Sequence, residues 1–200
     1  MPAIIPKHKY FFFGPYLTEM EVNPEYCQRL LKTGKTLKKS YRSNLAGQID
    51  QEYNFDLQKD PWIVKDFEIY INSWLDGFRS FTRGTQFNPT YEVHDFWINF
   101  QKSKEYNPLH IHMNCDLSFI LWLQVPQKML NEGKKNITSA ANPGSTTFVY
   151  GEPRWDVITE KICTPKKNTL MMFPANLRHH VMHFNSKVTR ISVSGNIKFV

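Results

Sequence analysis

Cysteine is scarce in this chain of 200 residues, and its three cysteines, Cys27, Cys115 and Cys163, are widely spaced. An odd number of cysteines without a Cys-x-x-Cys pattern argues against a disulfide framework and against a thiolate zinc site. The chain also lacks a run of roughly 20 apolar residues, the length of a membrane span. Residues 1–14 lack the continuous apolar region and small-residue cleavage site of a secretory signal. We therefore predict a soluble protein of a reducing, intracellular compartment with no membrane partner.

The chain is rich in basic charge and aromatic rings. It holds 25 Lys and Arg against 18 Asp and Glu, which gives a formal net charge of +7. The basic residues are dispersed, with the densest runs at residues 35–42 and 161–167, so a solvated basic surface and a nucleic-acid partner both stay open. With 41% hydrophobic residues the chain can bury one core, and we predict a single domain over residues 1–200.

The first 85 residues are expected to form a helical support. After an extended lead-in over residues 1–22, Asn23 and Pro24 are typical of a helix cap and first position, which predicts a helix over residues 25–39. Asp60 and Pro61 repeat this cap. From Trp62 to Phe78, apolar residues recur at the spacing of an amphipathic helix that should pack on a sheet.

After Gly84 the apolar period changes from that of a helix to that of a strand, and residues 86–200 are expected to form the core of the fold. Helices followed by strands predict an α+β protein, a double-stranded β-helix or jelly roll with its N-terminal helices packed on one sheet. Residues 127–145, rich in Lys, Asn and Gly, are expected to form a loop. The predicted strands span residues 91–101, 117–126, 146–151, 168–173, 179–185 and 189–199.

Two groups of histidines carry the most informative pattern. In an extended chain His110 and His112 point to the same face, where they could share a metal ion. His179 follows on a later strand, and antiparallel strands distant in sequence are neighbours in a jelly roll. A third ligand is therefore available, with open positions left on the metal. His180 would point to the opposite face, and His183 shares the face of His179 as a reserve candidate.

Arg190 and Ser192 lie on one face of the last predicted strand, with Ile191 and Val193 on the other. An arginine fork matches a carboxylate at two points, and a serine hydroxyl adds a third hydrogen bond. This pattern predicts a carboxylate clamp inside the barrel. An amphipathic edge strand with the same residues facing solvent is the alternative, and the nearby histidines favour the clamp.

These features together resemble the Fe(II)- and 2-oxoglutarate-dependent oxygenase superfamily, most closely its prolyl-hydroxylase-like branch of small oxygenases of bacteria and phages. The resemblance covers roughly residues 90–197. It implies that His110, His112 and His179 bind Fe(II), that Arg190 and Ser192 bind 2-oxoglutarate, and that Asn99 or Trp122 contacts its carboxylates. The matching strings are Trp97-Ile98-Asn99-Phe100, His110-Ile111-His112 before Leu117–Leu123, Phe173-Pro174-x-x-Leu177-x-His179, and Arg190-Ile191-Ser192-x-Ser194-x-Asn196.

One position departs from the superfamily pattern, which has Asp or Glu where this chain has His112. A site of three histidines would still hold Fe(II), although imidazole also suits zinc, copper and nickel. Asp116 could instead supply a carboxylate, or the native ion could be another metal. These alternatives stay open at the level of the sequence.

The resemblance implies a dioxygenase that uses O2 and 2-oxoglutarate to hydroxylate a protein or small-molecule substrate. An amino-acid side chain is expected, with peptidyl proline favoured and a nucleobase next. Its expected location is the cytoplasm, or the host cytoplasm for a phage protein. Two alternatives remain: a cupin-type dioxygenase that uses the same histidines without 2-oxoglutarate, and a metal-free jelly-roll module for binding or assembly.

Overall fold

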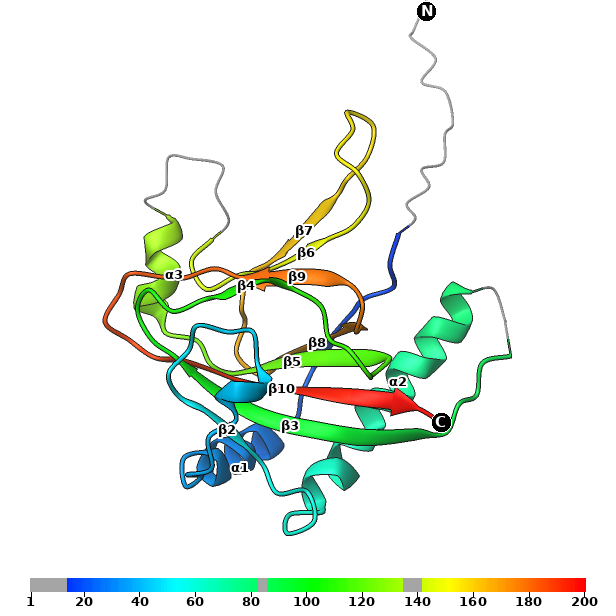
Figure 1. Cartoon of the computed structure of the whole chain (residues 1–200), viewed down its shortest axis with the longest axis horizontal. Helices are drawn as coiled ribbons and strands as arrows, with labels where there is room; N and C mark the ends of the chain where they lie inside the picture. The colour runs from blue at the N-terminus through cyan, green and yellow to red at the C-terminus, as the bar shows by residue number, and fades with distance from the viewer. Residues whose placement is uncertain (1–13, 83–85, 135–141) are drawn as a thin grey trace, which may run out of the picture.

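The computed structural model describes residues 14–82, 86–134 and 142–200, and it contains two antiparallel sheets that face each other (Figure 1). These sheets confirm the predicted α+β jelly roll. The larger sheet has the order β1 (Thr18–Glu21), β8 (Thr169–Pro174), β5 (Leu117–Gln124), β10 (Arg190–Phe199), β3 (Tyr91–Gln101) and β2 (Glu52–Asn54). The smaller sheet has the order β4 (Asn107–His110), β9 (Arg178–Val181), β6 (Thr146–Val149) and β7 (Glu160–Cys163).

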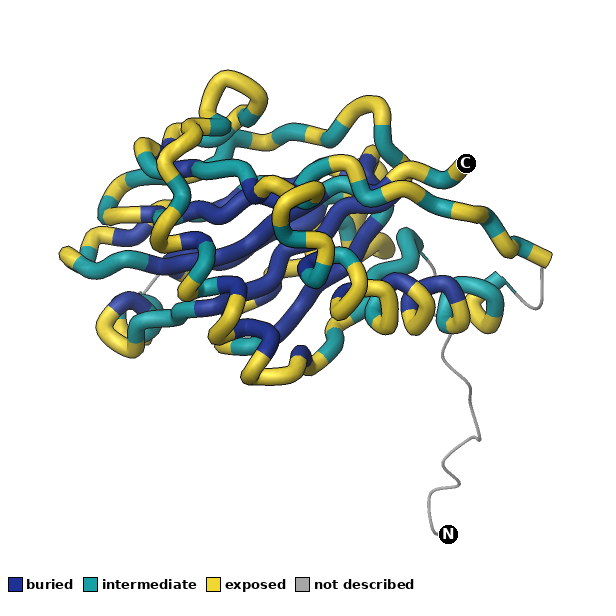
Figure 2. Tube along the Cα trace, turned by 90° about the horizontal axis from the view of Figure 1, so that it is seen from below, coloured by how far each residue is buried: buried dark blue, intermediate teal, exposed yellow. Residues whose placement is uncertain are grey.

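The central strands of the larger sheet are buried on both faces, which explains their nearly continuous apolar sequences. Along β5, Leu117, Phe119 and Leu121 belong to the core on the helical side. Ile120 and Trp122 belong to a second cluster on the side of the smaller sheet. Figure 2 shows this buried layer running through the middle of the molecule. The face toward the smaller sheet is where the candidate site lies.

Helices α1 (Pro24–Gly34) and α2 (Trp62–Phe81) cover the outer face of the larger sheet (Figure 1). The apolar stripe of α2 is buried as predicted, with Phe67 and Ile71 fully inaccessible to solvent. Asn23 caps α1, because its Oδ1 accepts a hydrogen bond from the Glu25 N–H at 2.8 Å. The helices therefore support the sheet from the side opposite the site.

Two helix boundaries differ from the prediction. Helix α1 ends at Gly34 and not at residue 39, because the chain then turns so that Ser40 can bridge to Tyr53 beside the larger sheet. Helix α2 begins at Trp62 with Pro61 in the capping position. Asp60 does not cap the backbone; its carboxylate accepts a hydrogen bond from the Trp62 indole at 3.0 Å.

Four short strands, one α-helix and a short 3-10 helix, η1 (Arg42–Asn44), were not predicted. Strand β1 lies in the predicted extended lead-in and β2 in the region expected to support the sheet with helices; both extend the larger sheet, while β4 and β7 complete the smaller one. The predicted loop over residues 127–145 contains the helix α3 (Gln127–Gly133), and its residues 135–141 lie outside the described residues, as do residues 1–13 of the predicted lead-in. The N-terminal region is thus part of the sheet as well as its support.

In the part of the chain that the structure describes, no helix has the length and apolar character needed to cross a membrane. All three cysteines are unpaired, with Cys27 and Cys163 buried and Cys115 partly exposed.

Candidate metal centre

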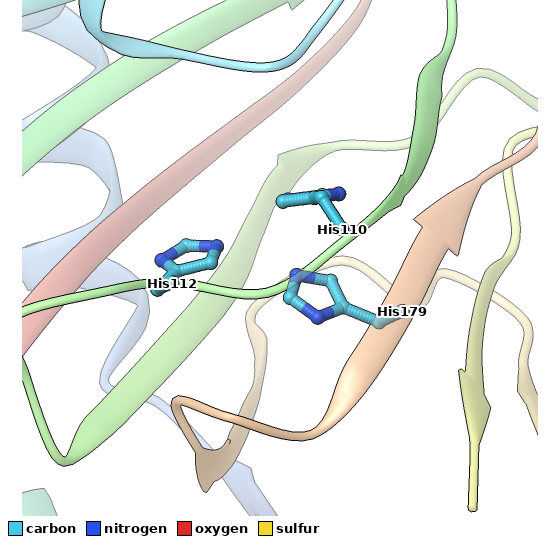
Figure 3. Close-up of side chains that lie close together, drawn as sticks. All are labelled: His110, His112 and His179. Carbon is cyan, nitrogen blue, oxygen red and sulfur yellow. The ribbon is translucent and has the colours of Figure 1, made fainter.

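The three predicted histidines meet between the two sheets. His110 at the end of β4 is the direct register partner of His179 on β9, and His112 follows β4 by two residues. Their rings point toward one another (Figure 3), with centroids 4.3 Å apart for His110 and His179 and 5.1 Å apart for His112 and His179. One nitrogen from each ring lies within 4.8 Å of the others, so the three can reach a single metal ion.

Hydrogen bonds orient each of these rings. Nδ1 of His110 lies 2.7 Å from the Pro108 carbonyl, and Nδ1 of His179 lies 2.9 Å from the Leu177 carbonyl. A carbonyl oxygen can only accept, so Nδ1 carries the proton in both rings. Nε2 of each ring therefore keeps its lone pair, as a metal ligand requires.

His112 is held by a chain of polar groups that leads to a carboxylate. Its Nδ1 lies 2.6 Å from Asn196 Oδ1, and the Asn196 amide donates to Asp95 Oδ2 at 3.2 Å. The Tyr41 hydroxyl donates to the other Asp95 oxygen at 2.5 Å. The Asn196 carbonyl oxygen thus faces the ring and fixes Nδ1 as the donor. Asp95 supplies, two groups away from the ring, a negative charge that the all-histidine set lacks.

Burial favours the neutral form of all three imidazoles. Desolvation, followed by repulsion from His110 and His112, lowers the pKa of His179 to about 3. Desolvation lowers the pKa of His112 to about 4, against the opposing effect of Asn196, and it also lowers the pKa of His110. Neutral imidazoles with free Nε2 atoms fit a divalent metal such as Fe(II).

Arg190, at the start of β10, holds an unpaired cation inside the protein. Its side chain is 1% exposed, and only Nη1 is bonded, to Gln101 Oε1 at 2.8 Å. Nε and Nη2 have no partner among the described residues, and desolvation lowers the pKa of Arg190 to about 9. A buried cation without a counter-ion is unfavourable, and a carboxylate fits the free donors of a guanidinium fork. Arg190 therefore fits one carboxylate of 2-oxoglutarate.

The other predicted cosubstrate residues share the face of Arg190. Ser192 lies in register between Asn99 on β3 and Trp122 on β5, and all three are buried. The Trp122 indole N–H and the Asn99 carbonyl oxygen have no partner among the described groups. Ser194, the next residue on this face of β10, lines the cavity that the histidines also line, whereas Arg190, Ser192, Asn99 and Trp122 are not among its lining residues.

Two reserve ligands are not brought to the histidines. Asp116 is exposed, and its carboxylate accepts a hydrogen bond from the Phe199 N–H at 2.9 Å. The chain turns away from the site between His112 and Asp116, where Asn114 has a φ of 62°. His183 lies beyond the end of β9 and is exposed. The structure thus groups His112, and neither reserve residue, with His110 and His179.

A cavity of about 350 Å³ opens beside the histidines, and several residues that line it were not predicted as part of the site. Asn196 could have been found, because it continues the period of two that begins at Arg190. Glu52 and Tyr41 come from the N-terminal region, where no motif marks them. They reach the cavity because β2 pairs with β3 at the edge of the larger sheet.

Comparison with known proteins agrees with this geometry. Residues 95–196 match the family model described as "Putative 2OG-Fe(II) oxygenase". No protein of curated function matches the chain.

The fold is similar to solved structures of low sequence identity. The viral collagen prolyl hydroxylase vCPH of Paramecium Bursaria Chlorella virus-1, in its 2-oxoglutarate complex, is 14% identical with a TM-score of 0.61, over 94% of this chain and 98% of that chain. A prolyl-4-hydroxylase of Pseudomonas putida is 10% identical with a TM-score of 0.54, over 92% of each chain. HygX of Streptomyces hygroscopicus, with nickel and 2-oxoglutarate bound, is 8% identical with a TM-score of 0.55, over 92% of this chain and 83% of that chain.

A jelly roll with three imidazoles that can reach one metal ion, and a buried arginine with two nitrogens unpaired among the described residues, fits a metal-dependent oxygenase. Because the family model covers half of its length, the chain belongs to the 2OG-Fe(II) oxygenase family. The cofactor of this family is Fe(II), and its cosubstrates are 2-oxoglutarate and O2, as the sequence resemblance implied.

Proposed function

We propose that this chain is a 2-oxoglutarate-dependent Fe(II) dioxygenase that hydroxylates an amino-acid side chain. The observation that carries the proposal is the combination of three convergent, neutral imidazoles with a buried guanidinium, two of whose nitrogens have no partner within the described ranges. Family membership supports the same chemistry. Bound Fe(II) and 2-oxoglutarate would together supply the oxidation, in which 2-oxoglutarate and O2 yield succinate, carbon dioxide and one oxygen atom for the substrate.

The protein groups have separate roles in this proposal. His110, His112 and His179 hold the metal through Nε2, and their Nδ1 hydrogen bonds keep the rings in that orientation. Arg190 binds the carboxylate of 2-oxoglutarate that is remote from the metal, with Ser192, Asn99 and Trp122 as further polar contacts. Gln101 positions Arg190, because its own amide N–H groups are fixed on the carbonyls of Glu105 and Met182.

An anaerobic titration with Fe(II) and 2-oxoglutarate tests the proposal through the visible metal-to-ligand charge-transfer band. We expect the band to need both additions, to be lost in His179→Ala and to be weakened in Arg190→Met. The matched control is His183→Ala, which removes an exposed histidine outside the cluster and should leave the band intact.

Other outcomes of this titration would overturn the proposal. Bound metal without a band in the wild type would favour a cupin-type dioxygenase that does not use 2-oxoglutarate. A wild type that binds no metal would leave a jelly-roll binding module. A band that survives in His179→Ala would remove that histidine from the ligand set.

Peptidyl proline is the first substrate to test, since vCPH and the Pseudomonas enzyme are prolyl hydroxylases. Turnover is measured as succinate formed with a proline-containing peptide.

We also propose a cytoplasmic location, because all three cysteines are unpaired, as a reducing compartment would keep them.

A further inference from the structure

Glu52 is a buried carboxyl group for which the proposed oxygenase chemistry has no use. It is the first residue of the edge strand β2, and its register partner on β3 is Asn99. The side chain is 1% exposed, and neither carboxylate oxygen has a partner among the described residues. An unpartnered acceptor of this kind is unfavourable unless a ligand supplies donors.

A second unpartnered oxygen faces the same place. Asn107 Oδ1, on β4 of the opposite sheet, is also buried without a partner among the described groups. A Cβ atom added to Gly47 would lie 2.4 Å from Asn107 Oδ1 and 3.3 Å from Glu52 Oε1, so this loop residue approaches both oxygens. The two sheets therefore present acceptors without donors to one small region.

This region belongs to the same cavity as the histidines. Glu52 and Asn107 both line it, together with His110, His112 and His179. The Tyr41 N–H donates to the Glu52 carbonyl at 2.9 Å, and the Tyr41 ring lies 5.9 Å from that of Trp97. The Trp97 ring lies 5.9 Å from that of His112 in turn. The rings of Tyr41 and Trp97 therefore form an aromatic side of the cavity that Glu52 also lines.

The charges around the cavity favour a cationic occupant. Asp95 is a second acid in the lining, and no lysine or arginine lines it in the described part of a chain whose net charge is +7. Arg42, whose charge acts on Glu52, is half-exposed and pairs with Asp50 at 3.3 Å. Desolvation raises the pKa of Glu52 to about 7, as expected for a carboxylate that lacks a counter-ion. Aromatic faces such as those of Tyr41 and Trp97 also attract cations.

We propose that Glu52 and Asn107 bind a protonated nitrogen of the substrate, so that the enzyme acts on a lysine or arginine side chain. This inference rests on the proposed oxygenase function and names its substrate class. The reaction converts one C–H bond of that side chain into C–OH, with one atom of O2, while 2-oxoglutarate takes the other atom and leaves as succinate and carbon dioxide. Glu52 would act as a specificity residue that holds the charged end of the side chain.

Matched pairs of probes separate charge from shape. Nα-acetyl-arginine methylamide is compared with its neutral citrulline analogue. Nα-acetyl-lysine methylamide, whose side-chain ammonium is free, is compared with its neutral norleucine analogue. Binding is measured by calorimetry on the full chain loaded with nickel and 2-oxoglutarate, without turnover. We expect at least one cationic probe to bind at least about tenfold more tightly than its neutral partner, a difference that Glu52→Gln abolishes.

The control variant is Glu68→Gln, which removes an equal charge from an exposed position on α2. It should keep the discrimination between the paired probes. Glu52→Gln should keep its affinity for 2-oxoglutarate, which shows that the variant is folded. The proposal is overturned if charged and neutral probes bind equally, if Glu52→Gln still discriminates between them, if neither cationic probe binds at millimolar concentration, or if only a prolyl peptide binds.

Succinate formation separates this inference from the oxygenase function. Cationic probes that bind through Glu52 without any succinate being formed would remove the oxygenase proposal and leave the binding site. Succinate formed with a prolyl peptide, together with no binding of the cationic probes, would do the reverse.

Discussion

The inner face of the larger sheet carries two buried charges of opposite sign that do not pair. Arg190 lies beside Gln101, and Glu52 lies beside Asn99, so the two charges flank positions of β3 that are only two residues apart. No ion pair joins them among those found in the described chain. Gln101 accepts from Arg190 instead. One region is therefore left with free donors and the other with free acceptors, and each is incomplete without a ligand of opposite charge.

Unpaired buried charges can reveal a ligand-binding site, because they make the ligand-free protein less stable. A protein selected only for stability would pair these charges or replace them with apolar groups. Retaining both unpaired stores an unfavourable free energy that binding can recover. The region around Arg190, here called the donor region, fits a dicarboxylate. The region around Glu52 and Asn107, here called the acceptor region, fits a cation.

The largest expected effect is a loss of 2-oxoglutarate affinity when Arg190 in the donor region is replaced. Arg190→Met should weaken 2-oxoglutarate binding by about 3 kcal/mol, more than a hundredfold, because it removes the buried partner of a carboxylate. The ligand-free protein should be at least as stable as the wild type, since an unpaired buried cation is lost. Calorimetry and urea unfolding measure the two effects. A loss of stability without loss of 2-oxoglutarate binding would show that Arg190 is structural.

The next effect concerns the acceptor region and depends on pH. The folded pKa of Glu52 is about 7 against 4.5 for the free side chain, so the folded state binds more protons within that window. Wild-type stability should therefore fall relative to Glu52→Gln as pH rises from 4.5 to about 7, by up to about 3 kcal/mol. Urea unfolding of the metal-free protein across this range measures the difference. Parallel pH profiles for the two proteins would show that Glu52 has a paired or solvated carboxylate.

A third change separates the two acids of the cavity. Asp95 is linked to His112 through Asn196, whereas the Glu52 carboxylate has no hydrogen-bond partner in the described part of the chain. Asp95→Asn should weaken nickel binding by about tenfold, the usual effect of losing a group that orients a metal-bound histidine. Its discrimination between arginine and citrulline probes should fall much less than in Glu52→Gln, because Asp95 is held by Asn196 and Tyr41. If that discrimination were lost while nickel binding persisted, Asp95 would be the substrate residue.

The smallest expected effect is on the affinity for cationic probes when Gly47→Ala adds one methyl group beside the acceptor region. Gly47→Ala would place a carbon 2.4 Å from Asn107 Oδ1, so the loop or the amide must shift. We expect cationic probes to bind about 1 kcal/mol more weakly, with 2-oxoglutarate affinity unchanged. Gly151→Ala is unsuitable as the control, because Gly151 has a φ of 76°; Gly14→Ala, with open space around it, is suitable. Equal losses in both alanine variants would contradict the expected role of Gly47.

The grouping of the three histidines could be predicted because an extended His-x-His segment turns both rings to one face and a later strand brings His179 beside them. His110 and His112 share a face, and Arg190 and Ser192 share another, so the order of the strands was enough to bring them together. Glu52 could not be found in this way. It belongs to a strand of three residues, and its burial comes from pairing with β3, a contact between segments more than 40 residues apart.

The same limit applies to parts of the fold. The strand β4 was not predicted because it contains Pro108, which cannot donate to a sheet, and its pairing with β9 is irregular. The predicted first helix was too long because Lys35, Lys38 and Lys39 favour a helix locally, whereas the bridge from Ser40 to Tyr53 ends it. Contacts between residues distant in the sequence thus set the bounds of these elements, which local residue preferences could not predict.

Strand β10 carries Arg190 at its start and Asn196, which orients His112, six residues later on the same face. At roughly 3.3 Å per residue these positions are separated by about 20 Å of backbone. The strand therefore fixes the distance between the residue proposed to bind 2-oxoglutarate and the residue that orients His112. Inserting one residue between them would turn one of the two side chains to the opposite face, while an insertion of two would keep both inward. Descendants of such a gene could keep the jelly roll after a single-residue insertion and still lose the enzyme.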